Sequence, residues 1–457
     1  MSLIEESPKA SRRKWVFGAI ALAIAATLPF IAFESTLVAR VLAITGVCLV
    51  LWLLELVPAF VPTLVLWILV PLFLSPLDPK YSLANTLRWA ADPVLALFFG
   101  GFALGVATER HGVSKRLADW AVSKSGNSFA LILVIVIAMT AFMSMWISNI
   151  AAAALMFAAL RPVVSGLEAD DPTRRTLLVG IAFAANLGGM ATPIGTGPNA
   201  IAIASTADTH PITFVDWMAF ALPLTIGLLI TAYALLYFSA RHANVGWRGH
   251  ITSLTFKSDS PKSTRALGLI SVLAASVVLW LTEPVHGIPA AVVSVGAAAS
   301  LFLSGLLRKS DLGRIDWSTL LLIAGGITLG KMLEASGLIH AAAAKLTLGE
   351  MNPYLAIFTL CFASALLSAL MSNTATAVLL IPLAGALMPE PSTAILIAVA
   401  ASFGMPFIIS TPPNAMAHGE GGVRSSDLFY PGVVIMLLGC AVVSLTGRAV
   451  LNFVGIP

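Results

Sequence analysis

Four short stretches of polar and helix-breaking residues interrupt an otherwise apolar chain. Two of them place a Ser-Asn pair at the head of an apolar run, and two combine Pro and Gly with Thr and Asn. They are Ser148-Asn149-Ile150, Ser372-Asn373-Thr374, ATPIGTGPN at 191–199 and STPPN at 410–414. Pro and Gly free backbone carbonyls and amides from helical hydrogen bonding, and such backbone is tolerated at membrane depth only where it lines a cavity.

The donor atoms of these stretches suit two kinds of ligand at once. Free carbonyls and the side-chain oxygens of Asn and Ser are hard ligands suited to Na⁺. The helix N-termini that follow each Ser-Asn pair present N–H groups and a positive dipole end to an anion. None of the four stretches contains Asp or Glu, whereas a cation-only transporter or a proton pump usually has a carboxylate in its path. The pattern therefore favours an anion that is bound together with cations. Hydrogen bonding between helices would explain a lone Ser-Asn pair, but not four such stretches in symmetric positions.

The composition predicts an all-α polytopic membrane protein. Of 457 residues, 58% are hydrophobic and 11% are charged, whereas a soluble domain carries about 25% charged residues. A membrane helix needs roughly 20 apolar residues, and the long apolar runs lack the alternation of a β-barrel. The three cysteines lie singly in apolar stretches, as packing residues do.

The apolar runs predict about 11 transmembrane helices and two re-entrant hairpins. The hairpins are expected at 128–162 and 353–389, and two interrupted helices at 174–207 and 391–423. The other helices are expected at 15–33, 37–56, 58–75, 93–110, 216–240, 265–283, 288–307, 317–346 and 428–453. With the N-terminus cytoplasmic and the C-terminus outside, twenty Lys and Arg residues fall inside and five outside, which agrees with the positive-inside rule.

The two halves of the chain repeat each other in sequence. Four motifs recur in the same order: WLLE at 52–55 and WLTE at 280–283, FFGGFALGVATERHGV at 98–113 and IAGGITLGKMLEASGL at 323–338, Ser144-xxx-Ser148-Asn149 and Ser368-xxx-Ser372-Asn373, and TGPNA at 196–200 and TPPNA at 411–415. On the predicted topology, the helix at 37–56 runs inward and its partner at 265–283 runs outward. Inverted repeats with interrupted helices are the architecture of secondary transporters, whose sites lie near the midplane at the repeat interface.

In these motifs the sequence resembles the divalent-anion/sodium symporter family, the INDY-type di- and tricarboxylate transporters. The resemblance covers nearly the whole chain. It implies a homodimer in the inner membrane, in which a scaffold holds a transport domain that moves as an elevator. The expected division is a cytoplasmic N-terminus at 1–14, scaffold parts at 15–127 and 265–350, transport parts at 128–240 and 351–457, and a cytoplasmic linker at 241–264.

The resemblance also implies two Na⁺ sites and one substrate site. The first Na⁺ site would use Ser144, Ser148, Asn149 and Gly195, and the second would use Ser368, Ser372, Asn373 and Ser410. The substrate residues would be Asn149, Ile150, Thr196, Gly197, Asn373, Thr374, Thr411 and Pro412. Coupling sodium ions are the only cofactor expected, and the partners are a small divalent anion, the lipid bilayer and a second copy of the chain, with no nucleic acid.

The resemblance thus favours sodium-coupled symport of a C4-dicarboxylate such as succinate, malate or fumarate. Two alternatives stay open: a sodium-independent dicarboxylate exchanger, and a carrier of another divalent anion such as sulfate or citrate. A channel is disfavoured because two hairpins that meet at mid-depth form a closed site. An enzyme is disfavoured because the seven histidines include no His-Glu-x-x-His motif and the chain has no Gly-x-Ser-x-Gly motif.

One residue departs from the family pattern. The first tip reads Ser-Asn-Ile, so Ile150 lacks the hydroxyl expected to bond one end of a dicarboxylate. A lost hydrogen bond to a charged group costs about 1.5–3 kcal/mol. If a backbone N–H or a water replaces it, the substrate class is unchanged. Otherwise the pattern favours a smaller anion such as sulfate, or a dianion with one apolar end.

Overall fold

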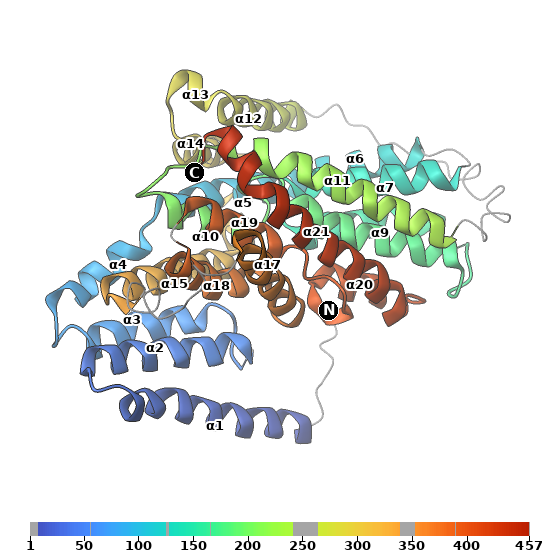
Figure 1. Cartoon of the computed structure of the whole chain (residues 1–457). Coiled ribbons are helices and arrows are strands. Elements are labelled where there is room, and N and C mark those ends of the chain that lie inside the picture. The colour runs from blue at the N-terminus through green and yellow to red at the C-terminus, as the bar shows by residue number, and fades with distance from the viewer. Residues whose placement is uncertain are drawn as a thin grey trace.

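The computed structural model describes residues 8–54, 56–124, 128–164, 166–240, 264–338, 352–388 and 390–456. All regular elements in these ranges are helices (Figure 1). The first half holds α1 Pro8–Ala32, α2 Thr36–Leu53, α3 Val61–Phe73, η1 Pro79–Tyr81, α4 Leu83–Ala90, α5 Pro93–Arg110, α6 Val113–Ser123, α7 Phe129–Ser144, α8 Asn149–Val164, α9 Pro172–Gly189, α10 Gly197–Thr206 and α11 Phe214–Ala240. The second half holds α12 Thr264–Leu281, α13 Glu283–His286, α14 Ala290–Leu303, η3 Lys309–Arg314, α15 Trp317–Ala335, α17 Pro353–Leu370, α18 Asn373–Leu387, α19 Pro391–Ala401, η5 Ile408–Ser410, α20 Pro412–Gly419 and α21 Ser425–Val454. The predictions for Glu55, for the linker up to residue 263 and for 339–351 lie outside the described residues.

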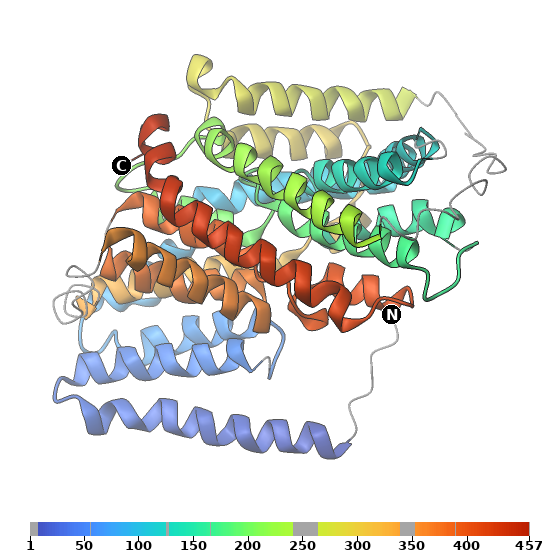
Figure 2. The ribbon, with the colours of Figure 1, turned by 45° about the vertical axis from the view of Figure 1, so that its right-hand side comes forward.

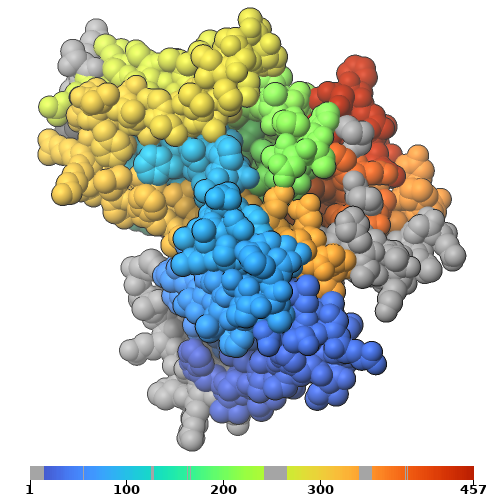
Figure 3. Space-filling model, turned by 90° about the vertical axis from the view of Figure 1, so that its left-hand side faces the viewer, coloured from blue at the N-terminus to red at the C-terminus, as the bar shows by residue number. Residues whose placement is uncertain are grey.

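The helices confirm a polytopic membrane fold. Seven described helices are long and apolar enough to cross a membrane: α1, α2, α5, α11, α15, α17 and α21. The shorter apolar helices include both arms of the first hairpin, α7 and α8, and the second arm of the other, α18. In two views, α1 and α12 lie at opposite edges of the bundle, and the hairpins and interrupted helices lie between them (Figures 1 and 2). The space-filling view likewise shows the N-terminal helices and α12–α14 at opposite ends of one face (Figure 3).

Two short helices, α4 and α6, were not predicted. Their sequences, LANTLRWA and VSKRLADWAVS, are amphipathic rather than apolar, so a search for membrane-length apolar runs passes over them. Helix α6 begins after Gly112, which has a φ of 63°. Gly337, the repeat partner of Gly112, has a φ of 73°. The repeated glycine therefore ends α5 and α15 in the left-handed conformation that a side chain would disfavour.

Glycine also sets how closely α5 and α15 pack in each half. A β-carbon at Gly100 would collide with the backbone of Ser294 in α14, and one at Gly325 would collide with the side chain of Thr63 in α3. These two glycines are repeat partners, so the same motif makes the same kind of close contact twice.

Candidate functional site

The first hairpin tip holds a cluster of three oxygen atoms, one of which is the hydroxyl oxygen of Ser144. This hydroxyl oxygen lies 2.7 Å from Oδ1 of Asn149 and 2.7 Å from the carbonyl oxygen of Ala185. Gly188 permits this approach, because a β-carbon there would lie 2.5 Å from the carbonyl oxygen of Ala141 in α7. A hydroxyl has one proton and can donate to only one of its two oxygen neighbours. With the amide oxygen facing the serine, the cluster has more acceptors than donors, which is the electrostatic environment of a hard cation.

The second hairpin tip reproduces this cluster. The hydroxyl oxygen of Ser368 lies 2.7 Å from Oδ1 of Asn373 and 2.6 Å from the carbonyl oxygen of Ala401, the last residue of α19. Ser144 and Ser368 are both fully buried. The structure therefore brings together Ser144 with Asn149 and Ser368 with Asn373, as the sequence predicted, and adds two carbonyls that the sequence did not indicate.

The other predicted sodium ligands have local structural contacts. Ser148 and Ser372 accept a hydrogen bond from the backbone N–H of Ala151 and Ala375, each at 3.2 Å, at the start of α8 and α18. Such N-caps satisfy a helix donor that otherwise has no partner. Ser410 accepts from the N–H of Phe407 at 2.9 Å, within its own break. Its repeat partner Gly195 packs so closely on the carbonyl of Gly189 that a β-carbon would collide with it.

A buried asparagine holds each helix break in shape. Nδ2 of Asn199 donates to the carbonyls of Gly189 and Thr192, at 3.1 and 2.7 Å. Nδ2 of Asn414 donates to the carbonyls of Met405 and Phe407, both at 2.9 Å. These asparagines are repeat partners and both are fully buried. Neither asparagine had a predicted role, although the recurrence of Asn in TGPNA and TPPNA was the available signal.

Replacing Asn414 with leucine should therefore destabilise the protein. The substitution leaves the buried carbonyl of Met405 without a partner, which costs about 1–3 kcal/mol, whereas the carbonyl of Phe407 still accepts from the N–H of Ser410. We expect a lower thermal unfolding midpoint in detergent than for wild type. The matched control is Asn452→Leu, because Asn452 is exposed near the end of α21. Equal midpoints for the two variants would contradict this role of Asn414.

Contacts between the two repeats bring the predicted substrate residues together. Nδ2 of Asn186 in α9 donates to the hydroxyl of Thr411 at 2.9 Å. Gly197, at the start of α10, lies against Thr374, whose side chain would collide with a β-carbon at that glycine. Each break thus contacts the opposite repeat.

The repeat partners of Gly197 and Thr374 are placed differently. Pro412 and Ile150 are both exposed, and the exposed fraction of Ile150 is 50%. Thr196 is half-buried and adjoins Gly197 at the start of α10. The region around the tips is therefore packed on the side of Thr374 and open on the side of Ile150.

The geometry restricts the chemistry to binding. None of the predicted site residues is titratable, so the site offers hydroxyls, amides and backbone groups but no acid, base or activated nucleophile. Four helices, α8, α10, α18 and α20, begin at or next to these residues. The N-termini of α8, α10 and α18 place N–H groups where an anion could lie. Helix α20 begins with Pro412 and Pro413, which have no N–H, and the N–H of Asn414 already donates to the hydroxyl of Thr411. Neutral oxygens beside helix N-termini are the groups of a transporter site, as in other inverted-repeat proteins.

Comparison with known proteins establishes the class and the family. Over 91% of this chain and 98% of the other, the fold matches the crystal structure of the Alcanivorax borkumensis YdaH transporter, with a TM-score of 0.58 and 16% sequence identity. This likeness shows the fold of a polytopic membrane protein. Residues 49–398 match the citrate transporter family CitMHS, so the protein is a membrane transporter and not an enzyme, and the chain belongs to this family.

Relatives in sequence include carriers of different anions. The sodium-dependent dicarboxylate transporter SdcS of Staphylococcus saprophyticus is 28% identical, over 89% of this chain and 84% of SdcS. The inorganic phosphate transporter PHO87 of Saccharomyces cerevisiae is 29% identical, over 89% of this chain and 45% of PHO87. The resemblance to the divalent-anion/sodium symporters is thereby confirmed at the level of the family.

Proposed function

We propose that this protein is a sodium-coupled symporter of C4-dicarboxylates such as succinate, malate and fumarate, located in the inner membrane. The observation that carries the proposal is the duplicated cluster of a Ser hydroxyl, an Asn amide oxygen and a backbone carbonyl at the two tips. Each cluster has the neutral oxygens that a sodium ion requires. The name of the relative SdcS, a sodium-dependent dicarboxylate transporter, supports both the ion and the substrate.

The substrate would lie between the tips. Asn149 and Asn373 each open a hairpin helix, and Thr374 and Thr411 add hydroxyls beside them. The helix N-termini offset the charge of the carboxylates in part, and sodium ions in the two clusters offset the rest. Binding of the anion would therefore depend on the cations, which is the basis of coupling.

The contacts of the repeated glycines support movement by an elevator. A β-carbon at Gly101 would lie 3.3 Å from Ile194 in the first break, whereas one at Gly326 would lie 2.5 Å from Val378, well beyond the second tip in α18. The two glycines are repeat partners, but the residues that they contact, Ile194 and Val378, are not repeat partners of each other. The structure is thus asymmetric between repeats, as expected for one end state of an alternating cycle.

The exposure of the residues equivalent to Ile194 and Val378 in the other repeat also supports an elevator. Ile409, the repeat partner of the buried Ile194, has an exposed fraction of 78%. Ala154, the repeat partner of the fully buried Val378, is also exposed. In the opposite end state, Gly326 would face Ile409 and Gly101 would face Ala154. The parts at 15–127 and 265–350 would then form the scaffold, and the parts at 128–240 and 351–457 would move.

A second candidate function is sodium-coupled transport of another divalent anion, such as sulfate, citrate or phosphate. Ile150 favours it, because this residue removes one hydroxyl from the side of the site that is open. PHO87, whose name describes an inorganic phosphate transporter, shows that relatives carry anions other than dicarboxylates.

Replacing Ile150 with threonine should tighten succinate binding. The new hydroxyl can donate to a carboxylate, and a hydrogen bond to a charged group is worth about 1.5–3 kcal/mol, which corresponds to an affinity gain of about tenfold or more. The measurement is succinate affinity of the purified protein in saturating Na⁺. Ile270→Thr in α12 is the control, because it makes the same change at a residue of similar exposure, 48%, outside the predicted substrate set. Unchanged or weaker affinity in Ile150→Thr would exclude Ile150 as a substrate contact.

A further inference from the structure

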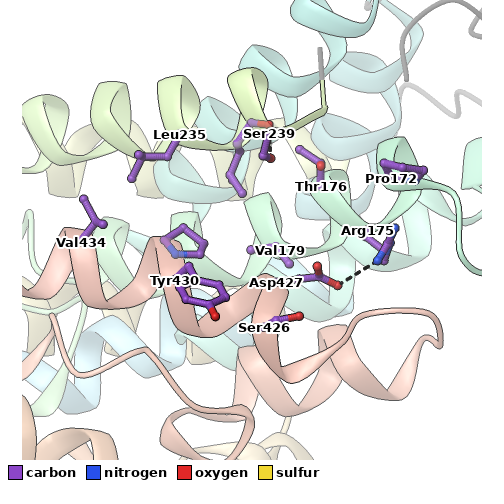
Figure 4. Close-up of a pocket in the computed structure, with 12 residues that line it drawn as sticks. Pro172, Arg175, Thr176, Val179, Leu235, Ser239, Ser426, Asp427, Tyr430 and Val434 are labelled. Carbon is purple, nitrogen blue, oxygen red and sulfur yellow. Dashed lines mark hydrogen bonds and ion pairs between the residues drawn. The ribbon is translucent and has the colours of Figure 1, made fainter. Parts of the chain in front are cut away.

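A cavity lies between the ends of three helices, away from the residues of the hairpin tips. It has a volume of about 520 Å³ and is lined by the first turns of α9 and α21 and the last turns of α11 (Figure 4). None of the predicted sodium or substrate residues lines it. Its volume falls in the range of pockets that hold small molecules.

The cavity is polar at the helix ends and apolar toward the middle of the bundle. In α9, Arg175 precedes Val179 by one turn, and in α21, Asp427 precedes Val434 by about two turns. At about 1.5 Å per residue, Val434 lies roughly 10 Å deeper along its helix than Asp427. In α11, which runs the other way, Leu235 likewise lies one turn deeper than Ser239. All three helices therefore present the same gradient, which matches an amphipathic molecule oriented along the bundle.

The polar end of the cavity holds one positive and one negative side chain that are incompletely paired. Nη1 of Arg175 lies 3.6 Å from Oδ2 of Asp427, which is longer than a hydrogen bond (Figure 4). Within the part of the chain that the structure describes, the buried Nε of Arg175 has no hydrogen-bond partner. Oδ2 of Asp427 accepts from the backbone N–H of Arg424 at 2.8 Å, and its side chain stays 26% exposed. The side chains of Arg175 and Asp427 thus lie side by side in the wall of the cavity without a hydrogen bond of normal length between them.

We propose that this cavity binds a phospholipid whose headgroup carries both a phosphate and a primary ammonium. The phosphate would accept hydrogen bonds from Arg175, whose planar fork suits phosphate oxygens. The ammonium would donate to Asp427, and the acyl chains would pass Leu235, Val179 and Val434. The first turns of α9 and α21 add the positive ends of two helix dipoles beside the phosphate.

The charges of the cavity discriminate among lipids. A choline headgroup has no N–H to donate to Asp427. A glycerol headgroup brings a phosphate but no positive charge, so Asp427 is left beside an added negative charge. Phosphatidylethanolamine is therefore the expected ligand, and phosphatidylcholine and phosphatidylglycerol are the comparisons.

The test is native mass spectrometry of the full chain in detergent with these three lipids, matched in acyl chains. We expect phosphatidylethanolamine to bind about tenfold more tightly than either other lipid, the effect of one charge-assisted hydrogen bond. Arg175→Gln should weaken binding by a similar factor, and Asp427→Asn should remove the preference over phosphatidylcholine. Arg448→Gln is the control, because Arg448 pairs with Glu390 at the other end of α21, outside the cavity.

Three outcomes would overturn the proposal. The first is equal affinity of the wild-type protein for the three lipids, a comparison that requires no variant to fold. The second is unchanged phosphatidylethanolamine binding in a folded Arg175→Gln protein. The third is full competition by soluble phosphoethanolamine at equal concentration, which would show that the apolar end of the cavity takes no part.

Discussion

Replacing Asn149 or Asn373 with alanine is expected to abolish sodium-driven uptake of succinate. Each asparagine supplies an amide oxygen 2.7 Å from the buried serine of its tip, and each stands at the start of a hairpin helix that would face the substrate. The substitution thus removes a cation ligand and a substrate contact together. A single lost hydrogen bond to a charged group lowers affinity by about tenfold or more, and the loss of both should reduce uptake much further. The measurement is the initial rate of uptake into proteoliposomes with an inward Na⁺ gradient.

Two companion variants make this result specific. Ser368→Ala removes only the hydroxyl of the second cluster, so it should raise the Na⁺ concentration required for half-maximal uptake. Thr140→Val is the control, because Thr140 is buried one turn before Ser144 but donates only to the carbonyl of Val136 in its own helix. Full uptake by Asn149→Ala with an unchanged Na⁺ requirement would show that the first cluster is not a sodium site.

Cross-linking Asp208→Cys to Lys331→Cys is expected to stop transport almost completely. Lys331 in α15 forms an ion pair with Asp208, which follows α10. Of the ion pairs that the structure describes, this one alone joins the proposed scaffold to the proposed moving part. A cavity of about 340 Å³ adjoins the pair, between α15 and the helices α10, α18 and α19. If the two parts slide past each other, the pair must separate in every cycle, and a short bis-maleimide bridge would prevent it.

A matched control exists on the same helix. Lys331 also pairs with Glu334 at 3.4 Å, within α15, so a bridge between Lys331→Cys and Glu334→Cys should leave uptake unchanged. The three native cysteines are buried, which limits background labelling. Uptake at the wild-type rate after complete Asp208–Lys331 cross-linking would be incompatible with the elevator.

Much of this arrangement was accessible from the sequence because the repeat is local and strongly patterned. The apolar runs predicted the hairpins and interrupted helices, since membrane helices need long apolar segments and the Pro and Gly residues mark where they break. The Ser-Asn tips were recognised because polar residues are rare at that depth. The serine–asparagine contact in each tip joins residues five apart in the chain, and the family resemblance indicated both members of each pair.

Other features depend on packing between distant segments and could not be predicted. The carbonyls of Ala185 and Ala401 have no sequence signature, because any residue supplies a backbone oxygen. The contact of Gly197 with Thr374 joins residues far apart in the chain, whereas their repeat partners Pro412 and Ile150 are exposed. Asn199 and Asn414 recur at equivalent positions of the two repeats in the sequence. Their hydrogen bonds to backbone carbonyls of the helix breaks become apparent only in the folded structure.

The most direct test of the central claim is uptake of radiolabelled succinate into proteoliposomes that contain the purified protein. Uptake would be compared under an inward Na⁺ gradient and an equal K⁺ gradient, each with and without internal succinate. We expect uptake that requires Na⁺ and proceeds without internal succinate. Uptake that requires internal succinate and is indifferent to Na⁺ would contradict it and identify an exchanger, and no succinate uptake in any arrangement would contradict the proposed substrate.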